Sequence, residues 1–362
     1  MFTMYNTKPE FFWLTNYLET LLSAIIWMPC TSATIAKQYR MVLDRYAQET
    51  SSVPEFVQWQ GHDFSMRGMS GIEAGLTSAC GHLLSFTGTD TIPAINLLEN
   101  YYNADSDKEL IGGSVAATEH SVMCMGTTDG ELETFRRLVC EIYPKGIVSI
   151  VSDTWDLWKV LTEYLPALKN EILARDGKVV IRPDSGDPVD IICGDPHGKS
   201  DVERKGVIEL LWETFGGHTN GKGYKELAPQ IGAIYGDSIT VERAVQICER
   251  LKEKGFSSTN IVFGIGSYTY QFNTRDTFGF AMKATYGEVH GEGREIFKDP
   301  VTDDGTKKSA KGLIKIEREN GSYILHDQVS WEEERQGELK EVFRDGKLLI
   351  DYTLAEIRSR LK

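Results

Sequence analysis

The sequence predicts an α/β protein built on a (β/α) barrel, with a smaller β-rich lobe towards its carboxyl-terminal end. Four apolar strands each run into an acidic or Gly-rich turn, and helix-like segments separate them, as in a parallel barrel. These segments are VSIVSDT (148–154), VVIRPDSGDP (179–188), GAIYGDS (232–238) and IVFGIGS (261–267). From about residue 288 the pattern changes to short strands, and Asn320-Gly321 is typical of a hairpin turn.

The remaining segments give the predicted order of elements. Residues 8–50 are predicted to form two helices broken near Pro29, because proline removes a helical N–H. A strand at 55–59 leads into the loop GHDFSMRGMSG. Further helices are predicted at 71–85, 91–102, 130–142, 155–172, 202–215 and 240–254. We therefore expect three parts: a helical segment at 1–50, the barrel domain at 51–287, and part of the smaller lobe at 288–362.

Composition limits the class of protein. The 362 residues are 41% hydrophobic and carry a net charge of −14, which argues against a nucleic-acid or anionic-membrane surface. The six cysteines are scattered without a CxxC pair, which favours a reduced, cytoplasmic setting. The apolar stretch from Phe11 to Met28 contains Asn16 and Glu19 and is predicted to be a buried core helix rather than a membrane span.

The loops after the four strands carry the predicted binding groups. Parallel strands of a barrel end at one rim, so the side chains that follow them should lie close together. These loops supply Asp153, Arg182, Asp184, Asp237 and the backbone amides of 264–266. A cation, carboxylates and bare N–H groups suit a phosphorylated substrate with Mg²⁺. The alternative for each loop is an ordinary turn, with glycine present only for its backbone freedom.

Two further segments offer chemistry. His62, Phe64 and Arg67 share one loop, where the phenyl ring suits stacking on a flat heteroaromatic ring and the arginine suits a phosphate. His120 follows a Gly-Gly-Ser turn, and an accessible imidazole there suits a general base or a phosphoryl acceptor. A packed phenylalanine, a surface arginine and a structural histidine are the alternatives.

Nine short blocks, ordered along nearly the whole chain, resemble the nicotinate/nicotinamide phosphoribosyltransferase family. They are WLTNYLET (13–20), GHDFSMRG (61–68), FTGTDT (86–91), AATEHS (116–121), VSDTWD (151–156), IRPDSGDP (181–188), GDS (236–238), TRD (274–276) and FKDP (297–300). The resemblance implies a nicotinate-type phosphoribosyltransferase barrel beside a mostly β lobe, in a homodimer with shared active sites. It also implies transfer of phosphoribose from phosphoribosyl diphosphate to nicotinamide, in NAD salvage, with ATP as a co-substrate.

The resemblance implies roles for individual residues. Phe64 stacks on the pyridine ring, and Asp90 and Ser149 lie near its amide. His120 is the histidine that ATP phosphorylates. The other residues that match ligand-binding positions are Arg67, Arg182, Asp184, Gly236, Asp237, Gly266, Ser267, Arg275, Lys283, Lys298 and Lys307. Of the whole set, His120, Asp184 and Asp237 are the predicted catalytic residues, and no metal ligands are assigned.

The chain departs from the family pattern in three places. Ser267 and Tyr268 stand where the family has glycines, and Ala281 stands where it has a serine. The match begins inside the family's N-terminal segment, so we expect an incomplete β-rich lobe and weak activity from this chain alone. Two alternatives therefore stay open: a nicotinate phosphoribosyltransferase, or an inactive homologue that serves as a binding or dimer partner.

The chemistry of Asp90 favours nicotinamide over nicotinate. A carboxamide offers two N–H donors that an ionised aspartate can accept. A carboxylate only accepts hydrogen bonds, and the charge of Asp90 would repel it. The sequence therefore predicts a nicotinamide-using enzyme.

Overall fold

The computed structural model describes residues 2–297 and 310–361. The chain forms two compact units, one of residues 28–274 with 353–362 and one of residues 1–27 with 275–352. We call them the barrel unit and the β-rich unit. The sequence predicts boundaries after residues 50 and 287, whereas the structure divides the chain after residues 27, 274 and 352. The carboxyl-terminal helix therefore belongs to the barrel unit.

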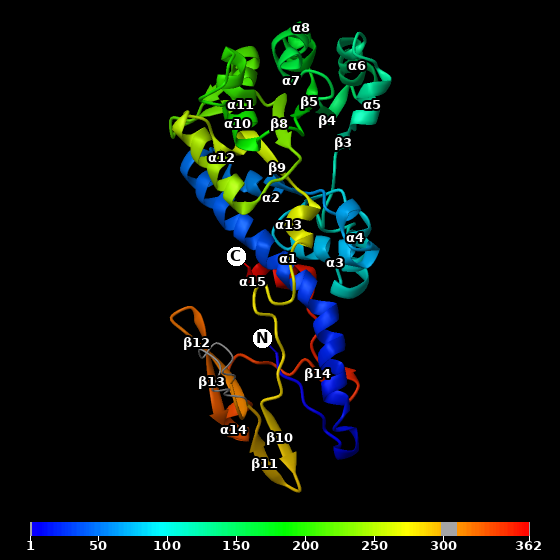
Figure 1. Ribbon diagram of the computed structural model, residues 1–362, viewed down its shortest axis with the longest axis vertical. Helices are drawn as coiled ribbons and strands as arrows, with labels where there is room; N and C mark the ends of the chain where they lie inside the picture. The colour runs from blue at the N-terminus through cyan, green and yellow to red at the C-terminus, as the bar shows by residue number, and fades with distance from the viewer. Residues whose placement is uncertain (1, 298–309, 362) are drawn as a thin grey trace. The chain divides into compact units, whose positions relative to one another are not determined.

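A parallel sheet of seven strands organises the barrel unit, in the order β2-β1-β9-β8-β5-β4-β3 (Figure 1). The predicted α/β architecture is confirmed as a curled, barrel-like sheet. Its strands are β1 (Gly61–Asp63), β2 (Gly88–Thr89), β3 (Ala116–Ala117), β4 (Lys145–Val151), β5 (Asp176–Arg182), β8 (Ile231–Tyr235) and β9 (Ile261–Ile265).

The four strands predicted from the sequence, β4, β5, β8 and β9, are consecutive neighbours in this sheet. Their apolar β-branched residues explain why, because such side chains pack well on a pleated surface. Val148, Ile150, Val179 and Ile181 are fully buried. Since all neighbouring strands run parallel, their carboxyl ends lie at one edge, and the loops that follow share that edge.

Three helices that follow β5 and β8 lie along the outer side of the sheet (Figure 1): α10 (Pro188–Cys193), α11 (Asp201–Phe215) and α12 (Val241–Glu253). Each begins at a side-chain cap. Asp187 accepts hydrogen bonds from the first N–H groups of α10, Ser200 forms a capping box with Glu203, and Thr240 caps α12. Asp187 and Thr240 also end the loops after β5 and β8, so these caps help to hold both loops in place.

Helix α1 (Leu14–Thr50) runs without interruption through Pro29, so the predicted break is wrong. A proline inside a helix costs about 3 kcal/mol. Burial on the carboxyl-terminal side of Pro29 offsets this cost, because Ala36, Tyr39 and Leu43 are fully buried. Helix α3 (Ile72–His82) contacts α1 at Pro29. A Cβ on Gly81 of α3 would lie 2.5 Å from the carbonyl oxygen of Pro29, so only glycine fits there.

The amino-terminal part of α1 is not the buried core helix that the sequence predicts. Trp13 just before the helix, then Tyr17, Leu21 and Ile25, recur every four residues and are 54%, 67%, 47% and 51% exposed. Helix α1 is long and apolar enough to cross a membrane, and 28% of its most apolar window is buried. Core helices and signal sequences pass the same test, so this is weak evidence for a membrane span.

The predicted strand at 55–59 is also wrong. Pro54 starts a 3₁₀ turn (Pro54–Phe56) that continues into α2 (Val57–Gln60), and the strand begins only at Gly61. Proline is well suited to such a start because its N–H would be unpaired in any case. The predicted helix at 155–172 forms as four consecutive pieces: α7 (Leu157–Lys159), a π-helical turn (Val160–Tyr164), α8 (Leu165–Ala167) and α9 (Lys169–Leu173).

The remaining elements of the barrel unit are short. They are 3₁₀ turns at Met66–Gly68 and Ser258–Asn260, a π-helical turn at Leu138–Ile142, helices α4 (Pro93–Tyr102), α5 (His120–Met125), α6 (Glu131–Arg137), α13 (Ser267–Gln271) and α15 (Leu354–Arg360), and the hairpin of β6 (Gly217–Thr219) and β7 (Lys225–Leu227). The predicted helices at 71–85, 91–102, 130–142, 202–215 and 240–254 are thereby confirmed, with bounds shifted by a few residues.

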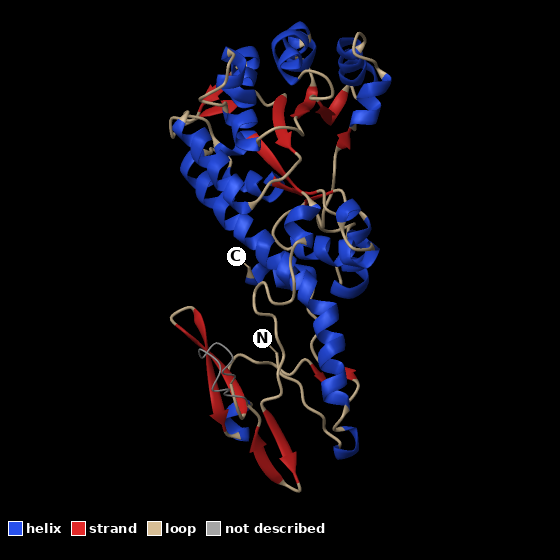
Figure 2. Cartoon of the chain, viewed as in Figure 1, coloured by secondary structure: helices blue, strands red, loops and turns tan. Residues whose placement is uncertain are grey.

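Apart from the part of α1 that precedes residue 28, the β-rich unit consists of hairpins and short helical turns (Figure 2). It contains Pro9–Phe11, β10 (Tyr286–Val289), β11 (Glu292–Glu295), β12 (Leu313–Glu319), β13 (Ser322–Val329), α14 (Trp331–Glu334), β14 (Phe343–Arg344) and β15 (Lys347–Leu348). Asn320 and Gly321 join β12 to β13 with φ of 50° and 84°, which confirms the predicted hairpin turn. Tyr5 and Tyr286 each pack edge-on against Trp331 at 5.7 Å.

Candidate active site at the carboxyl edge of the sheet

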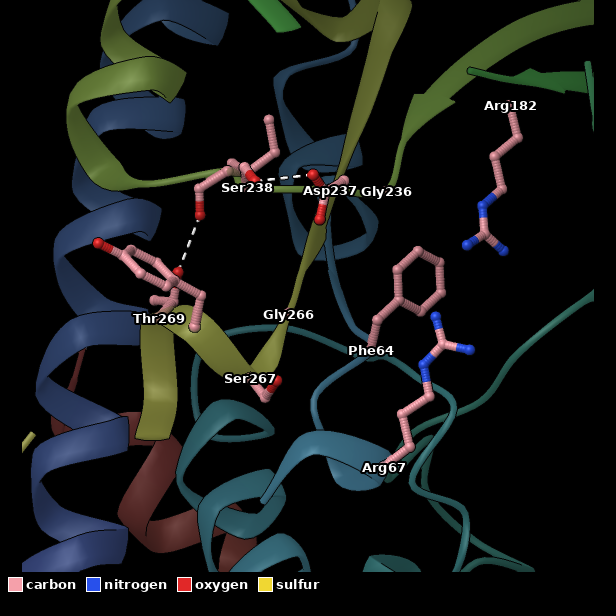
Figure 3. A pocket seen from close by; sticks show the side chains of 11 residues that line it. Phe64, Arg67, Arg182, Gly236, Asp237, Ser238, Gly266, Ser267 and Thr269 are labelled. Carbon is pink, nitrogen blue, oxygen red and sulfur yellow. Dashed lines mark hydrogen bonds between the residues drawn. The ribbon is translucent and has the colours of Figure 1, made fainter. Parts of the chain in front are cut away.

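A cavity of about 140 Å³ opens where β1, β5, β8 and β9 end (Figure 3). The loop after β1 contributes Phe64 and Arg67, and β5 contributes Arg182 as its last residue. The remaining lining residues follow β8 or β9: Gly236, Asp237, Ser238, Ile239, Gly266, Ser267, Tyr268 and Thr269. The structure thus brings together seven predicted site residues from the ends of four separate strands.

Two glycines allow the cavity walls to approach one another. A Cβ on Gly264 would lie 2.5 Å from two ring carbons of Phe64. A Cβ on Gly236 would lie 2.5 Å from Oδ1 of Asp184 and 3.0 Å from Nε of Arg182. Any larger residue would therefore displace the aromatic ring or the charged pair, so close approach explains both glycines.

Two arginines make one side of the cavity positive. The guanidinium carbon of Arg182 lies 4.8 Å from the ring centroid of Phe64. Figure 3 shows the guanidinium group of Arg67 on the same side of the ring. Guanidinium groups bind phosphate oxygens in pairs of hydrogen bonds, so these side chains can hold a phosphorylated ligand beside an aromatic surface.

Three loops contribute carboxylates, which are negatively charged, to the site: Asp153, Asp184 and Asp237. Arg182 contacts Asp184 at 3.6 Å, and Asp237 accepts a hydrogen bond from Ser238 at 2.7 Å. Burial raises the pKa of Asp184; Arg182 opposes this rise, and the nearby carboxylates of Asp153 and Asp237 add to it. Within the described residues, the buried Oδ1 of Asp184 accepts no hydrogen bond. This oxygen pairs with Arg182 only at 3.6 Å, so it can still accept a hydrogen bond from a ligand hydroxyl or from a hydrated Mg²⁺.

His120 begins helix α5 and contacts this carboxylate group. Its Nε2 lies 3.3 Å from Oδ1 of Asp153. The second oxygen of Asp153 accepts hydrogen bonds from the backbone N–H of Asp184 at 2.9 Å and from Ser185 at 2.6 Å. Asp153 therefore joins the loops after β4 and β5 to His120, whose side chain is 49% exposed. An exposed imidazole held by a carboxylate is a suitable nucleophile.

Asp90 belongs to a separate cluster. Its Oδ1 lies 2.8 Å from Nε2 of His62 and accepts a hydrogen bond from Ser114 at 2.6 Å. Burial would raise the pKa of Asp90, but the hydrogen bonds from His62 and Ser114 outweigh it and lower that pKa. His62 also packs against Phe64, with the ring centroids 4.8 Å apart. The cluster thus contacts the aromatic residue of the cavity through His62.

Three other predicted residues are described but do not line the cavity. Ser149 is buried in β4, and its backbone carbonyl accepts a hydrogen bond from Thr118. Arg275 and Lys283 belong to the β-rich unit and are exposed. Lys298 and Lys307 lie outside the described residues.

His62 belongs to the sequence segment that also holds Phe64 and Arg67, but its contact with Asp90 was not predicted. Sequence reasoning missed three contributors: Ser114, Ser238 and Thr269. The only local signal was for Ser238, which ends the Gly-Asp-Ser turn and has a φ of 53°. Ser267 and Tyr268, which replace family glycines, begin α13 with a helical backbone that accepts side chains. Ser267 packs towards Gly68, because a Cβ on that glycine would lie 2.0 Å from the serine Oγ.

Comparison with known proteins decides the family. The model of the nicotinate phosphoribosyltransferase (NAPRTase) family matches residues 59–347, which is most of the chain. The chain belongs to the nicotinate phosphoribosyltransferase family. The resemblance found in the sequence is thereby confirmed, and this family membership makes the chain a relative of NAD-salvage phosphoribosyltransferases.

Individual members of the family agree with this assignment. The nicotinamide phosphoribosyltransferase of Acinetobacter baylyi is 57% identical over 99% of this chain and 72% of its own length. The enzymes of that name from Mycoplasma pneumoniae and Xanthomonas campestris pv. campestris are 44% and 33% identical, over 84% and 99% of this chain. The matches span 64% and 74% of these two relatives' own lengths.

A solved structure shares the fold at low sequence identity. The nicotinate-nucleotide pyrophosphorylase from Pyrococcus furiosus superposes with a TM-score of 0.51 and 14% identity. The match covers 92% of this chain and 69% of the other. At this identity the likeness concerns the fold alone.

Proposed function

We propose that this chain is a nicotinamide phosphoribosyltransferase, which transfers phosphoribose from phosphoribosyl diphosphate to nicotinamide and releases pyrophosphate. The observation that carries the proposal is the cavity at the strand ends. There an aromatic ring lies beside two guanidinium groups, and Asp237 and the glycine turns after β8 and β9 complete the lining. The names of relatives that are 33–57% identical support the same reaction.

The ring end of the site is assigned to Phe64 and Asp90. Phe64 offers its face to the pyridine ring, because an aromatic pair in offset or edge geometry adds about 0.5–1.5 kcal/mol beyond burial. Asp90 accepts the carboxamide N–H groups. The lowered pKa of Asp90 keeps it ionised at neutral pH, which favours an amide donor over a carboxylate. The family resemblance adds Ser149 as a proposed neighbour of the amide.

The phosphoribosyl end is assigned to the charged residues. Arg67 and Arg182 hold the phosphate oxygens, and the turns at Gly236 and Gly266 offer backbone N–H groups. Asp184 and Asp237 accept ribose hydroxyls. When bound, Mg²⁺ would neutralise part of the charge on the leaving pyrophosphate. Oδ1 of Asp184, which pairs with Arg182 at 3.6 Å but accepts no hydrogen bond within the described residues, fits a role in holding the ion. These groups stabilise developing charge at both ends of the breaking bond.

We further propose that His120 accepts a phosphoryl group from ATP. Its exposed imidazole and its contact with Asp153 support this role, because the carboxylate would stabilise the charged ring. Asp153 also contacts the loop of Asp184, so a phosphoryl group on His120 would lie close to the carboxylates of the site. The family resemblance adds a cytoplasmic homodimer to this proposal, with Arg275, Lys283, Lys298 and Lys307 near the phosphates.

The test is a direct assay of mononucleotide formation with nicotinamide and, separately, with nicotinate. We expect product from nicotinamide, with Asp237→Asn retaining the fold but losing most turnover. Preferential use of nicotinate would identify the alternative enzyme of the same family. No product from either ring, with a folded protein, would instead favour a binding or dimer partner. Sedimentation measures the oligomeric state in the same samples.

A further inference from the structure

One imidazole contacts both residues that are assigned to the nicotinamide ring. His62 lies in the middle of β1, where both neighbours in the strand are buried. Its Nε2 is 2.8 Å from Oδ1 of Asp90, and its ring centroid is 4.8 Å from that of Phe64. The side chain of His62 is 12% exposed, against 49% for Asp90. The histidine therefore lies behind the carboxylate, on its protein side.

The two carboxylate oxygens of Asp90 differ in their hydrogen bonds, because both protein donors contact Oδ1. A carboxylate accepts hydrogen bonds and does not donate them, so the proton of the contact belongs to Nε2 of His62. Ser114 donates to the same Oδ1 at 2.6 Å from the loop before β3. Among the described residues, no hydrogen bond reaches Oδ2. Two donors from separate elements thus fix the carboxylate and leave one oxygen available for a ligand.

The backbone makes room for the imidazole. His62 is paired with Gly88 in the parallel register of β1 and β2. A Cβ on Gly88 would lie 2.7 Å from Nδ1 of His62, which is closer than real side chains approach. Glycine at position 88 therefore lets the ring lie against β2 while Nε2 reaches Asp90.

We propose that His62 is a positioning residue for amide recognition: it holds Asp90 so that Oδ2 accepts a carboxamide N–H of the pyridine substrate. The inference rests on the proposed function and extends it, because it assigns a specificity role to a residue outside the cavity lining. His62 acts through Asp90 and does not touch the reacting atoms. The loss of its N–H should therefore affect the binding of nicotinamide and leave phosphoribosyl diphosphate binding unchanged.

Two variants separate the donor from the ring. His62→Phe keeps an aromatic ring against Phe64 and removes the N–H, whereas His62→Gln removes the ring and keeps an N–H near the position of Nε2. We expect His62→Phe to weaken nicotinamide binding about tenfold, as the loss of a charge-assisted hydrogen bond does. We expect His62→Gln to recover most of that loss. The preference for nicotinamide over nicotinate should narrow in His62→Phe in the same proportion.

A matched control comes from a second histidine–carboxylate pair. His218 lies on the β6–β7 hairpin, with Nε2 3.1 Å from Glu226 and its side chain 63% exposed. His218→Phe makes the same chemical change away from the ring residues, and nicotinamide affinity should stay as in the parent.

Calorimetry measures nicotinamide affinity independently of turnover, and steady-state kinetics gives the KM for each substrate. Wild-type affinity in His62→Phe, or equal weakening in both His62 variants, would overturn the positioning role. Equal rises in KM for nicotinamide and phosphoribosyl diphosphate would overturn it too, because a structural defect has that effect. A parent that binds nicotinamide without forming mononucleotide would refute the proposed function, while the variant affinities still decide the role of His62. A parent that does not bind nicotinamide would refute both.

Discussion

Replacing Gly264 by alanine tests whether the position of Phe64 controls the reaction. A Cβ at residue 264 would lie 2.5 Å from two ring carbons of Phe64 and 2.8 Å from Cα of Gly236. Carbon atoms in contact are about 3.5 Å apart, so the ring or the strand must move by about 1 Å. A misplacement of about 1 Å in a positioning group can lower a rate by about 100-fold.

We therefore expect Gly264→Ala to lower kcat/KM for nicotinamide by roughly 10- to 100-fold. Overpacking of this kind costs about 1–3 kcal/mol of stability, so the thermal midpoint should also fall. Gly221→Ala is the control, since a Cβ there meets nothing within 4 Å. The assay follows mononucleotide formation, with calorimetry of nicotinamide binding in parallel. A folded Gly264→Ala protein with the kcat/KM and affinity of the parent would refute the reasoning.

Three other substitutions have defined outcomes. Asp90→Asn should weaken discrimination against nicotinate, because an asparagine amide both donates and accepts without charge repulsion; an unchanged ratio of kcat/KM for the two rings would exclude Asp90 from the amide site. His120→Ala should abolish acid-labile labelling by γ-labelled ATP and retain some uncoupled transfer, whereas equal labelling of both proteins would contradict the phosphohistidine. Burial raises the pKa of Glu131 from 4.5 to about 7, so the folded state binds this proton more tightly and loses stability as the pH rises through about 7. Glu131→Gln should accordingly raise the thermal midpoint at about pH 8 and change it little at about pH 5; a gain independent of pH would contradict this account.

The main strands could be predicted because their signal is local. β4, β5, β8 and β9 are continuous apolar runs that end in turn residues, and the Asn-Gly hairpin turn needs only two residues. Strands of two or three residues, such as β1, β2 and β3, carry too few side chains for a periodic pattern. The course of α1 through Pro29 depends on packing against distant elements, which overrides local propensity.

The candidate site divides in the same way. Arg182, Asp184, Asp237 and Gly266 follow recognisable strands, so the barrel rule places them at one edge without knowledge of the contacts. The contact between His62 and Asp90 joins two short strands through side-chain geometry, and no local pattern encodes it. The orientation of each carboxylate oxygen, which matters most for specificity, is available only from the structure.

The pairing of the sheet also has a consequence for synthesis of the protein on the ribosome. β1 occupies an inner place in the sheet, yet one of its partners is β9, with His62 opposite Gly264. At about 5–20 residues per second, the roughly 200 residues between them take about 10–40 s to be translated. During that time one edge of β1 lacks its partner strand, and such edges pair readily with other chains. The same long separation in sequence also slows the pairing of β1 with β9 when the complete chain refolds. In pulse-labelled hydrogen exchange during refolding, we expect β4 and β5 to be protected earlier than β1, since they are neighbours in both sequence and space. Simultaneous protection of all three strands would contradict this order.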